Sequence, residues 1–128
     1  MRWTLALAAM LAALPVKAQQ VGVSAAVYRE RADERGSQVE PAILLARGDR
    51  VVTIVTWDAP RGGTYTIVTP VPAGLALQSA SHRDLHVSSD GGRTWRRLVD
   101  PDNAPRDATH LRWQVVGDGR LSYRALVR

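Results

Sequence analysis

Three segments of the chain alternate between apolar and polar positions, which is the pattern of a half-buried β-strand. They are residues 21–27, 110–116 and 121–127. A fourth segment, 50–57, differs because its apolar residues occupy both odd and even positions. Side chains that are apolar on both faces are typical of a strand inside a sheet. The pattern therefore predicts that 50–57 is the central strand.

Shorter segments add further predicted strands at 64–69 and 75–79, and Pro70 and Pro72 indicate that the first of these ends there or lies at a sheet edge. Segments 85–89 and 94–99 flank an Asp-Gly-Gly turn and predict a hairpin. The polar, charged stretch 29–38 predicts a loop, with about two turns of solvated helix as the alternative. We therefore expect an all-β fold, a β-sandwich of about seven to eight short antiparallel strands.

The first eighteen residues have the features of a signal peptide. Met1-Arg2 is positively charged, residues 3–14 are uncharged and rich in Ala and Leu, and Val16 and Ala18 are small residues at a cleavage site. We expect a signal helix over 1–18, cleaved after Ala18, and a single β-sandwich domain over 19–128. The apolar run is shorter than the about 20 residues that cross a bilayer, so we expect no stable membrane anchor after cleavage.

Composition narrows the classes of partner. The chain has no Cys, so neither a disulfide nor a Cys-linked lipid is expected. The formal net charge is +5, and cleavage would remove Arg2 and Lys17, two of the 17 basic residues, against 12 acidic ones. The remaining arginines alternate with acidic residues, as in 29–35, whereas nucleic-acid binding needs a patch of one sign. We expect no nucleic-acid partner.

An ordered set of motifs then suggests a family. In chain order these are Arg47-Gly48-Asp49, Val71-Pro72-Ala73-Gly74-Leu75, residues 87–95 (VSSDGGRTW), residues 109–113 (THLRW) and residues 121–128 (LSYRALVR). Over 48–128 the chain resembles the conserved repeat domain of bacterial surface and secreted proteins. This resemblance implies an immunoglobulin-like β-sandwich and an exported, non-catalytic module of the cell envelope. Such domains often occur in tandem, and this chain carries a single copy.

Two segments depart from the family pattern. Residues 59–63 replace an Asn-x-Gly stretch, and a Pro-Gly-rich segment before the last strand is shortened to residues 117–119. The resemblance implies no catalytic residue, so neither departure removes one.

Residues 88–95 also fit the Asp-box of sialidases, S-x-D-x-G-x-T-W. We interpret this motif as a structural turn, in which Asp90 accepts backbone N–H groups, Gly91 and Gly92 permit positive φ, and Trp95 packs in the core or between strands. A propeller needs several blades of about 40 residues, which this chain is too short to supply. No nucleophile elbow of the G-x-S-x-G type occurs either, so we expect no enzyme and no catalytic residues.

The chain has three histidines, His82, His86 and His110, and Asp84 lies between the first two. On a strand, His82 and His86 would share a face about 13 Å apart. We expect no metal site and no cofactor, and we expect His110 to pack or hydrogen-bond at a strand end. A zinc or copper site formed by Asp84, His86 and His110, with His82 nearby, stays open as the alternative.

Trp57 and Arg61 form a possible contact patch, because Trp and Arg are frequent interface anchors. The competing interpretation buries Trp57 at one end of the sandwich. Taken together, the sequence predicts an exported module, periplasmic or secreted, with a structural or protein-binding role and an envelope or surface protein as partner. The alternative is a periplasmic protein that binds a metal or another small ligand.

Overall fold

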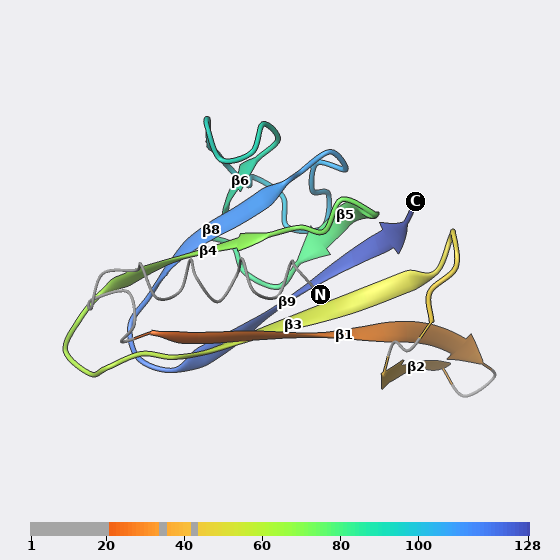
Figure 1. The fold of residues 1–128 in the computed structure, drawn as a ribbon, viewed down its shortest axis with the longest axis horizontal. Coiled ribbons are helices and arrows are strands. Elements are labelled where there is room, and N and C mark those ends of the chain that lie inside the picture. The colour runs from red at the N-terminus through yellow and green to blue at the C-terminus, as the bar shows by residue number, and fades with distance from the viewer. Residues whose placement is uncertain (1–20, 34–35, 42–43) are drawn as a thin grey trace, which may run out of the picture.

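The computed structural model describes residues 21–33, 36–41 and 44–128, so the predicted signal peptide lies outside the described residues. Within these ranges all regular secondary structure is β-strand, arranged in two antiparallel sheets (Figure 1). This arrangement is consistent with a β-sandwich and confirms the all-β prediction. The same ranges contain no helix that is long and apolar enough to cross a membrane.

The first sheet has five strands in the order β2-β1-β3-β9-β5. Their bounds are Gly22–Asp33 (β1), Gly36–Pro41 (β2), Arg50–Asp58 (β3), Leu75–Ala80 (β5) and Gly119–Val127 (β9). β3 lies between β1 and β9, which confirms the central strand predicted at 50–57. Its inward face is buried in the core, and on its outer face Val52 is buried whereas Ile54 is partly buried.

The second sheet has four strands in the order β4-β8-β6-β7. Their bounds are Tyr65–Pro70 (β4), His86–Ser88 (β6), Arg96–Arg97 (β7) and His110–Val115 (β8). β6 and β7 pair as the predicted hairpin. β4 ends at Pro70 and lies at the sheet edge, as the prolines indicated. The described residues thus contain nine strands, more than the seven to eight expected.

The additional strand is β2, which pairs with β1 in the charged stretch 29–38, where the predicted loop or short helix is wrong. β1 continues to Asp33 and pairs with β2 from Tyr28 onwards. Arg29 stands directly opposite Glu40, and its Nε–H donates to Glu40 Oε1 at 2.9 Å. At a sheet edge, opposite charges facing each other stabilise strand pairing without any hydrophobic pattern. Apolar alternation therefore could not reveal this hairpin.

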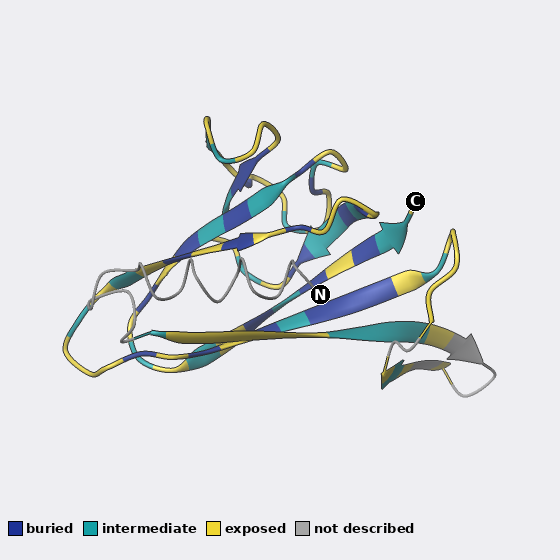
Figure 2. Ribbon diagram, viewed as in Figure 1, coloured by how far each residue is buried: buried dark blue, intermediate teal, exposed yellow. Residues whose placement is uncertain are grey.

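The core lies between the two sheets and is built from their facing side chains (Figure 2). In β8 the residues Leu111, Trp113 and Val115 are all buried, as the alternation predicted. In β9 the buried residues are Leu121, Tyr123 and Ala125. Residues 110, 112 and 114 must consequently project from the opposite, outer face of the four-stranded sheet.

The alternation in β1 predicts the strand but not its burial. All residues from 22 to 26 are exposed, and Val23 is 47% exposed, whereas Val21 and Val27 pack against the core. β2 pairs only with the part of β1 that begins at Tyr28. The first half of β1 therefore has β3 as its one neighbour among the described strands, and its side chains are less covered.

Candidate functional site

The hairpin between β6 and β7 is organised around the carboxylate of Asp90. Its Oδ1 accepts the backbone N–H groups of Arg93 (3.1 Å) and Thr94 (2.9 Å) and the hydroxyl of Ser88 (2.7 Å). Its Oδ2 accepts the Thr94 hydroxyl at 2.6 Å. These hydrogen bonds, led by the one from the Thr94 side chain, lower the pKa of Asp90 to about 2. Asp90 is the turn residue that the motif predicts.

The same hairpin is tied to the start of β8. Gly91 N–H donates to Thr109 Oγ1 at 2.9 Å, and Thr109 N–H donates to the carbonyl of Ser88 at 2.7 Å. Gly91 and Gly92 adopt φ values of 81° and 93°, which L side chains rarely adopt. The turn is thus fixed relative to β8 as well as within itself.

Trp95 follows this turn and does not enter the core. It is half-buried, and the guanidinium carbon of Arg112 on β8 lies 4.4 Å from the centre of its ring. A methyl group at Gly92 would lie 3.6 Å from Trp95 Cζ2, so the indole also packs against the turn. Trp95 therefore packs between strands, one of the two roles that the sequence left open for it, and it positions Arg112.

Arg112 belongs to a row of side chains that crosses all four strands of the second sheet. It stands opposite Val68 of β4 on one side and His86 of β6 on the other, and His86 in turn stands opposite Arg97 of β7. Val68 is 51% exposed. A depression of about 700 Å³ lies beside this row, lined by Thr66, Asp84, His86, Arg112, Trp113 and Gln114.

We call this surface the Arg112 face. It comprises Thr66, Val68, Asp84, His86, Trp95, Arg97, Arg112 and Gln114.

The two arginines of the Arg112 face differ in their ion pairing. Arg97 forms an exposed ion pair with Asp84, with 3.4 Å between the guanidinium nitrogen and the carboxylate oxygen. The guanidinium of Arg112 forms no hydrogen bond or ion pair within the described parts of the chain, and its contact there is the Trp95 ring. A fixed guanidinium of this kind can bind an anionic group from another molecule.

The sequence indicated two members of this surface as metal candidates, His86 and Asp84, but it missed Arg112. The signal was available, because the alternation in 110–116 places residue 112 on the face opposite the buried residues 111 and 113. What the alternation could not show is that Trp95 lies across β6 and contacts that arginine.

The histidines do not come together. His82 lies beside Ser81 and makes an edge contact with Trp57, with 6.3 Å between the ring centres, whereas His110 Nδ1 lies 3.0 Å from Thr109 Oγ1 at the start of β8. Across the described residues, no three His, Cys, Asp or Glu side chains are grouped so that they could hold a metal ion.

The predicted strand face shared by His82 and His86 is also wrong. Residues 81–85 form no strand, because the chain there crosses from β5 in one sheet to β6 in the other.

The structure confirms the interpretation that buries Trp57, so the possible contact patch of Trp57 and Arg61 is wrong. Trp57 is 5% exposed, its Nε1–H donates to the Gly117 carbonyl at 3.1 Å, and its ring centre lies 5.6 Å from that of Trp113. Arg61 is exposed in the loop that follows β3. The residue parity of β3 explains the burial, since Trp57 shares the inward face with Val51 and Val55.

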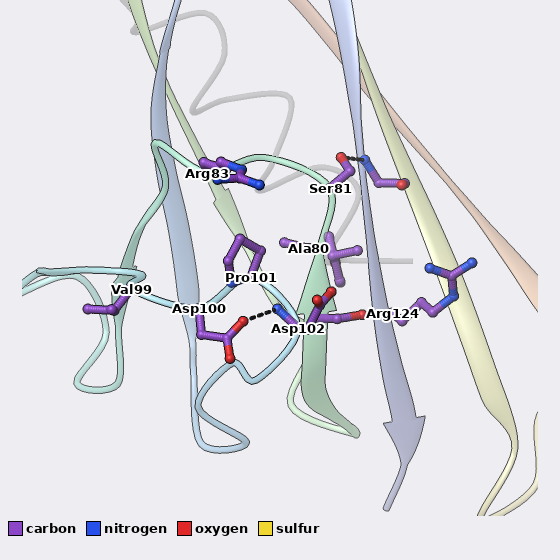
Figure 3. Close-up of a pocket in the computed structure, with 11 residues that line it drawn as sticks. Ala80, Ser81, Arg83, Val99, Asp100, Pro101, Asp102 and Arg124 are labelled. Atoms are coloured by element: carbon purple, nitrogen blue, oxygen red, sulfur yellow. Dashed lines mark hydrogen bonds between the residues drawn. The ribbon is translucent and has the colours of Figure 1, made fainter.

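A second depression, of about 510 Å³, lies beside β5 and β9 (Figure 3). Its Asp100 and Asp102 belong to a turn in which Asp102 N–H donates to Asp100 Oδ1 at 3.0 Å. Arg124 is directed away from this turn and pairs with Glu30, 3.5 Å from its Nε.

The turn also covers the edge of β5. Ala80 N–H donates to the Pro101 carbonyl and Ala104 N–H to the Gln78 carbonyl, both at 2.9 Å. These hydrogen bonds hold the loop that lines this depression against β5, which is a structural role.

No protein-family model, curated protein or solved structure matches this chain.

Proposed function

We propose that this protein is an exported, non-catalytic module of the cell envelope that binds a protein partner through the Arg112 face. The signal-peptide features of residues 1–18 and the motifs shared with the conserved repeat domain support the export and the envelope role. The same motifs, together with the two antiparallel sheets, support an immunoglobulin-like β-sandwich.

One observation carries the binding role. Arg112 stacks on Trp95, has no ion pair among the described residues, and lies directly opposite the exposed Val68. Aromatic and arginine side chains contribute most of the affinity in many protein interfaces, and apolar neighbours exclude water around them. The Arg112 face combines all three kinds of side chain on the surface of a sheet, where a partner can reach them.

Site-specific photo-cross-linking in the native host tests this proposal. A photoreactive residue replaces Val68 on the Arg112 face, and in a control protein it replaces Thr56, an exposed residue of β3 in the other sheet. We expect a discrete cross-linked protein from position 68 and none from position 56, and we expect Arg112→Ala to reduce its yield. Equal cross-linking from both positions, or none from position 68, would reject the Arg112 face as the binding surface.

A further inference from the structure

We infer that Arg112 is the receptor for a carboxylate and that the partner presents an acidic peptide segment to it. This inference deepens the proposed function and rests on it. The first reason is preorganisation, because the indole of Trp95 supports the guanidinium at 4.4 Å. Trp95 is itself positioned by the Asp90 turn. An arginine held in this way loses little side-chain freedom on binding and keeps its planar fork of N–H donors available.

The second reason is that the nearby carboxylates already have partners. Asp90 accepts hydrogen bonds from Ser88, Arg93 and Thr94 within its own turn. Asp84 pairs with Arg97. Neither carboxylate forms an ion pair with Arg112 in the described part of the chain, so the N–H donors of its guanidinium remain available to a negatively charged group from another molecule.

The third reason distinguishes an acidic peptide from other anions. Val68 lies directly opposite Arg112 and is 51% exposed, so it can contact the methylene groups that precede a Glu carboxylate. Phosphate offers no such apolar stem. Arg112 also covers a face of the Trp95 ring, which is the surface on which a sugar ring would stack.

The neighbouring cross-strand pair fits a peptide as well. Thr66 and Gln114 stand opposite each other on β4 and β8, and both are exposed beside the depression. A hydroxyl and a carboxamide both donate and accept hydrogen bonds, as peptide groups do. A carboxylate at Arg112 would thus place the adjoining peptide backbone near side chains that can pair with it.

The test is a titration of the purified, ¹⁵N-labelled protein with hexaglutamate, with hexaglutamine as the neutral peptide and inorganic phosphate as the competing anion. All titrations use the same ionic strength, about 0.15 M, because exposed charges are screened by salt. The readouts are the dissociation constant and the indole Nε1–H resonance of Trp95, which lies against Arg112. We expect saturable binding and a resonance shift with hexaglutamate, and neither with hexaglutamine or phosphate.

Three variants locate the site. Arg112→Gln should weaken hexaglutamate binding about tenfold or more, since a charge-assisted hydrogen bond is lost. Arg112→Lys should fall between Arg112→Gln and the original protein, because it keeps the charge but not the planar fork. Arg120→Gln changes an exposed arginine of β9, in the other sheet, and should bind like the original protein.

Unchanged binding by Arg112→Gln would overturn the inference, and so would equal binding of hexaglutamine or phosphate. The Trp95 resonance in the original protein gives an independent result if a variant does not fold. The experiments also distinguish failure of the carboxylate inference from failure of the proposed function. If cross-linking at position 68 persists in Arg112→Gln, the Arg112 face remains the proposed binding surface, but the inference that it binds a carboxylate is rejected.

Discussion

At the scale of single residues, Asp90 is positioned by hydrogen bonds to neighbours in sequence, whereas Trp57 is positioned by packing against distant residues. Asp90 is exposed, yet its carboxylate organises the turn through hydrogen bonds to its neighbours in sequence. Trp57 is buried, and its position depends on contacts with residues that are distant in sequence, namely Gly117 and Trp113. Sequence motifs describe the first kind of residue well, because all of its partners lie within one short segment.

The Asp90 turn predicts a specific pH dependence. The pKa of Asp90 is lowered from its ordinary value of 3.8 to about 2 in the folded protein. A carboxyl group whose pKa is lower when folded stabilises the fold above its unfolded pKa, and this contribution disappears as the pH falls through the folded pKa. The free energy of unfolding should therefore decrease between about pH 4 and about pH 2, and in Asp90→Asn it should decrease less steeply.

Urea unfolding across this pH range measures both slopes. Asp84→Asn provides a matched control, because in the described residues the exposed Asp84 carboxylate pairs with one exposed arginine, Arg97. The free energy of unfolding of this variant at neutral pH should therefore differ little from that of the original protein. Identical slopes for Asp90→Asn and the original protein would contradict the assigned role of Asp90.

At the scale of elements, the close packing of β3 on β9 is the feature that fixes one end of the core. Gly119 stands opposite Trp57 in the pairing of these strands, and the indole lies directly over it. The Trp57 Nε1–H then reaches the Gly117 carbonyl in the turn before β9. A short turn with Gly117 and Gly119 at its ends thus provides room for a buried tryptophan.

Gly119→Ala should consequently destabilise the protein. The added Cβ would lie 2.8 Å from Cζ2 and 3.1 Å from Cε2 of Trp57, so the indole must shift. Overpacking of this kind typically costs about 1–3 kcal/mol. Chemical denaturation measures the change, and Gly74→Ala is the control, since its Cβ would enter open space and should alter stability by less than about 0.5 kcal/mol. Equal stabilities for the two variants would show that Trp57 adapts without cost.

At the scale of the whole molecule, the proposed binding surface is formed by outward-facing side chains of all four strands of the second sheet, and not by the backbone of a sheet edge. The edge of β5 is paired with the loop at Pro101 and Ala104, and β4 ends at Pro70. Edges closed by loops or proline are protected from adding further strands. The Arg112 face lies instead on the outer surface of the four-stranded sheet, where side chains rather than backbone groups would meet a partner.

The proposed export of the whole chain has its own test. Cleavage after Ala18 should leave a protein that begins at Gln19, because small residues at positions 16 and 18 define the site. In Ala18→Trp a large side chain replaces the small one at the cleavage site, so the protein should remain uncleaved and keep residues 1–18. Mass spectrometry of protein from expressing cells distinguishes the two forms, with Ala13→Trp as a control inside the apolar run. If both variants keep the same mass as the original protein, the predicted cleavage site is wrong.

The strands whose burial alternates, and the turns whose conformation depends on nearby residues, could be predicted from the amino-acid sequence alone. β8 and β9 were predicted from alternation, β3 from apolar residues on both of its faces, and the Asp90 turn from its own residue types. The sequence did not reveal the hairpin of β1 and β2. There the pairing includes an ion pair between Arg29 and Glu40, and ionic pairing leaves no apolar pattern.

Contacts between side chains of different strands, in contrast, became visible in the folded protein. Periodicity shows that residues 112 and 113 point in opposite directions, but strand order decides that Arg112 lies near Trp95, because β6 stands between β7 and β8. The same holds for the position of the Trp57 indole, which packs against the glycine that β9 places opposite it. The physical reason is that alternation is a local property of one strand, whereas the neighbours of a strand depend on the path of the whole chain.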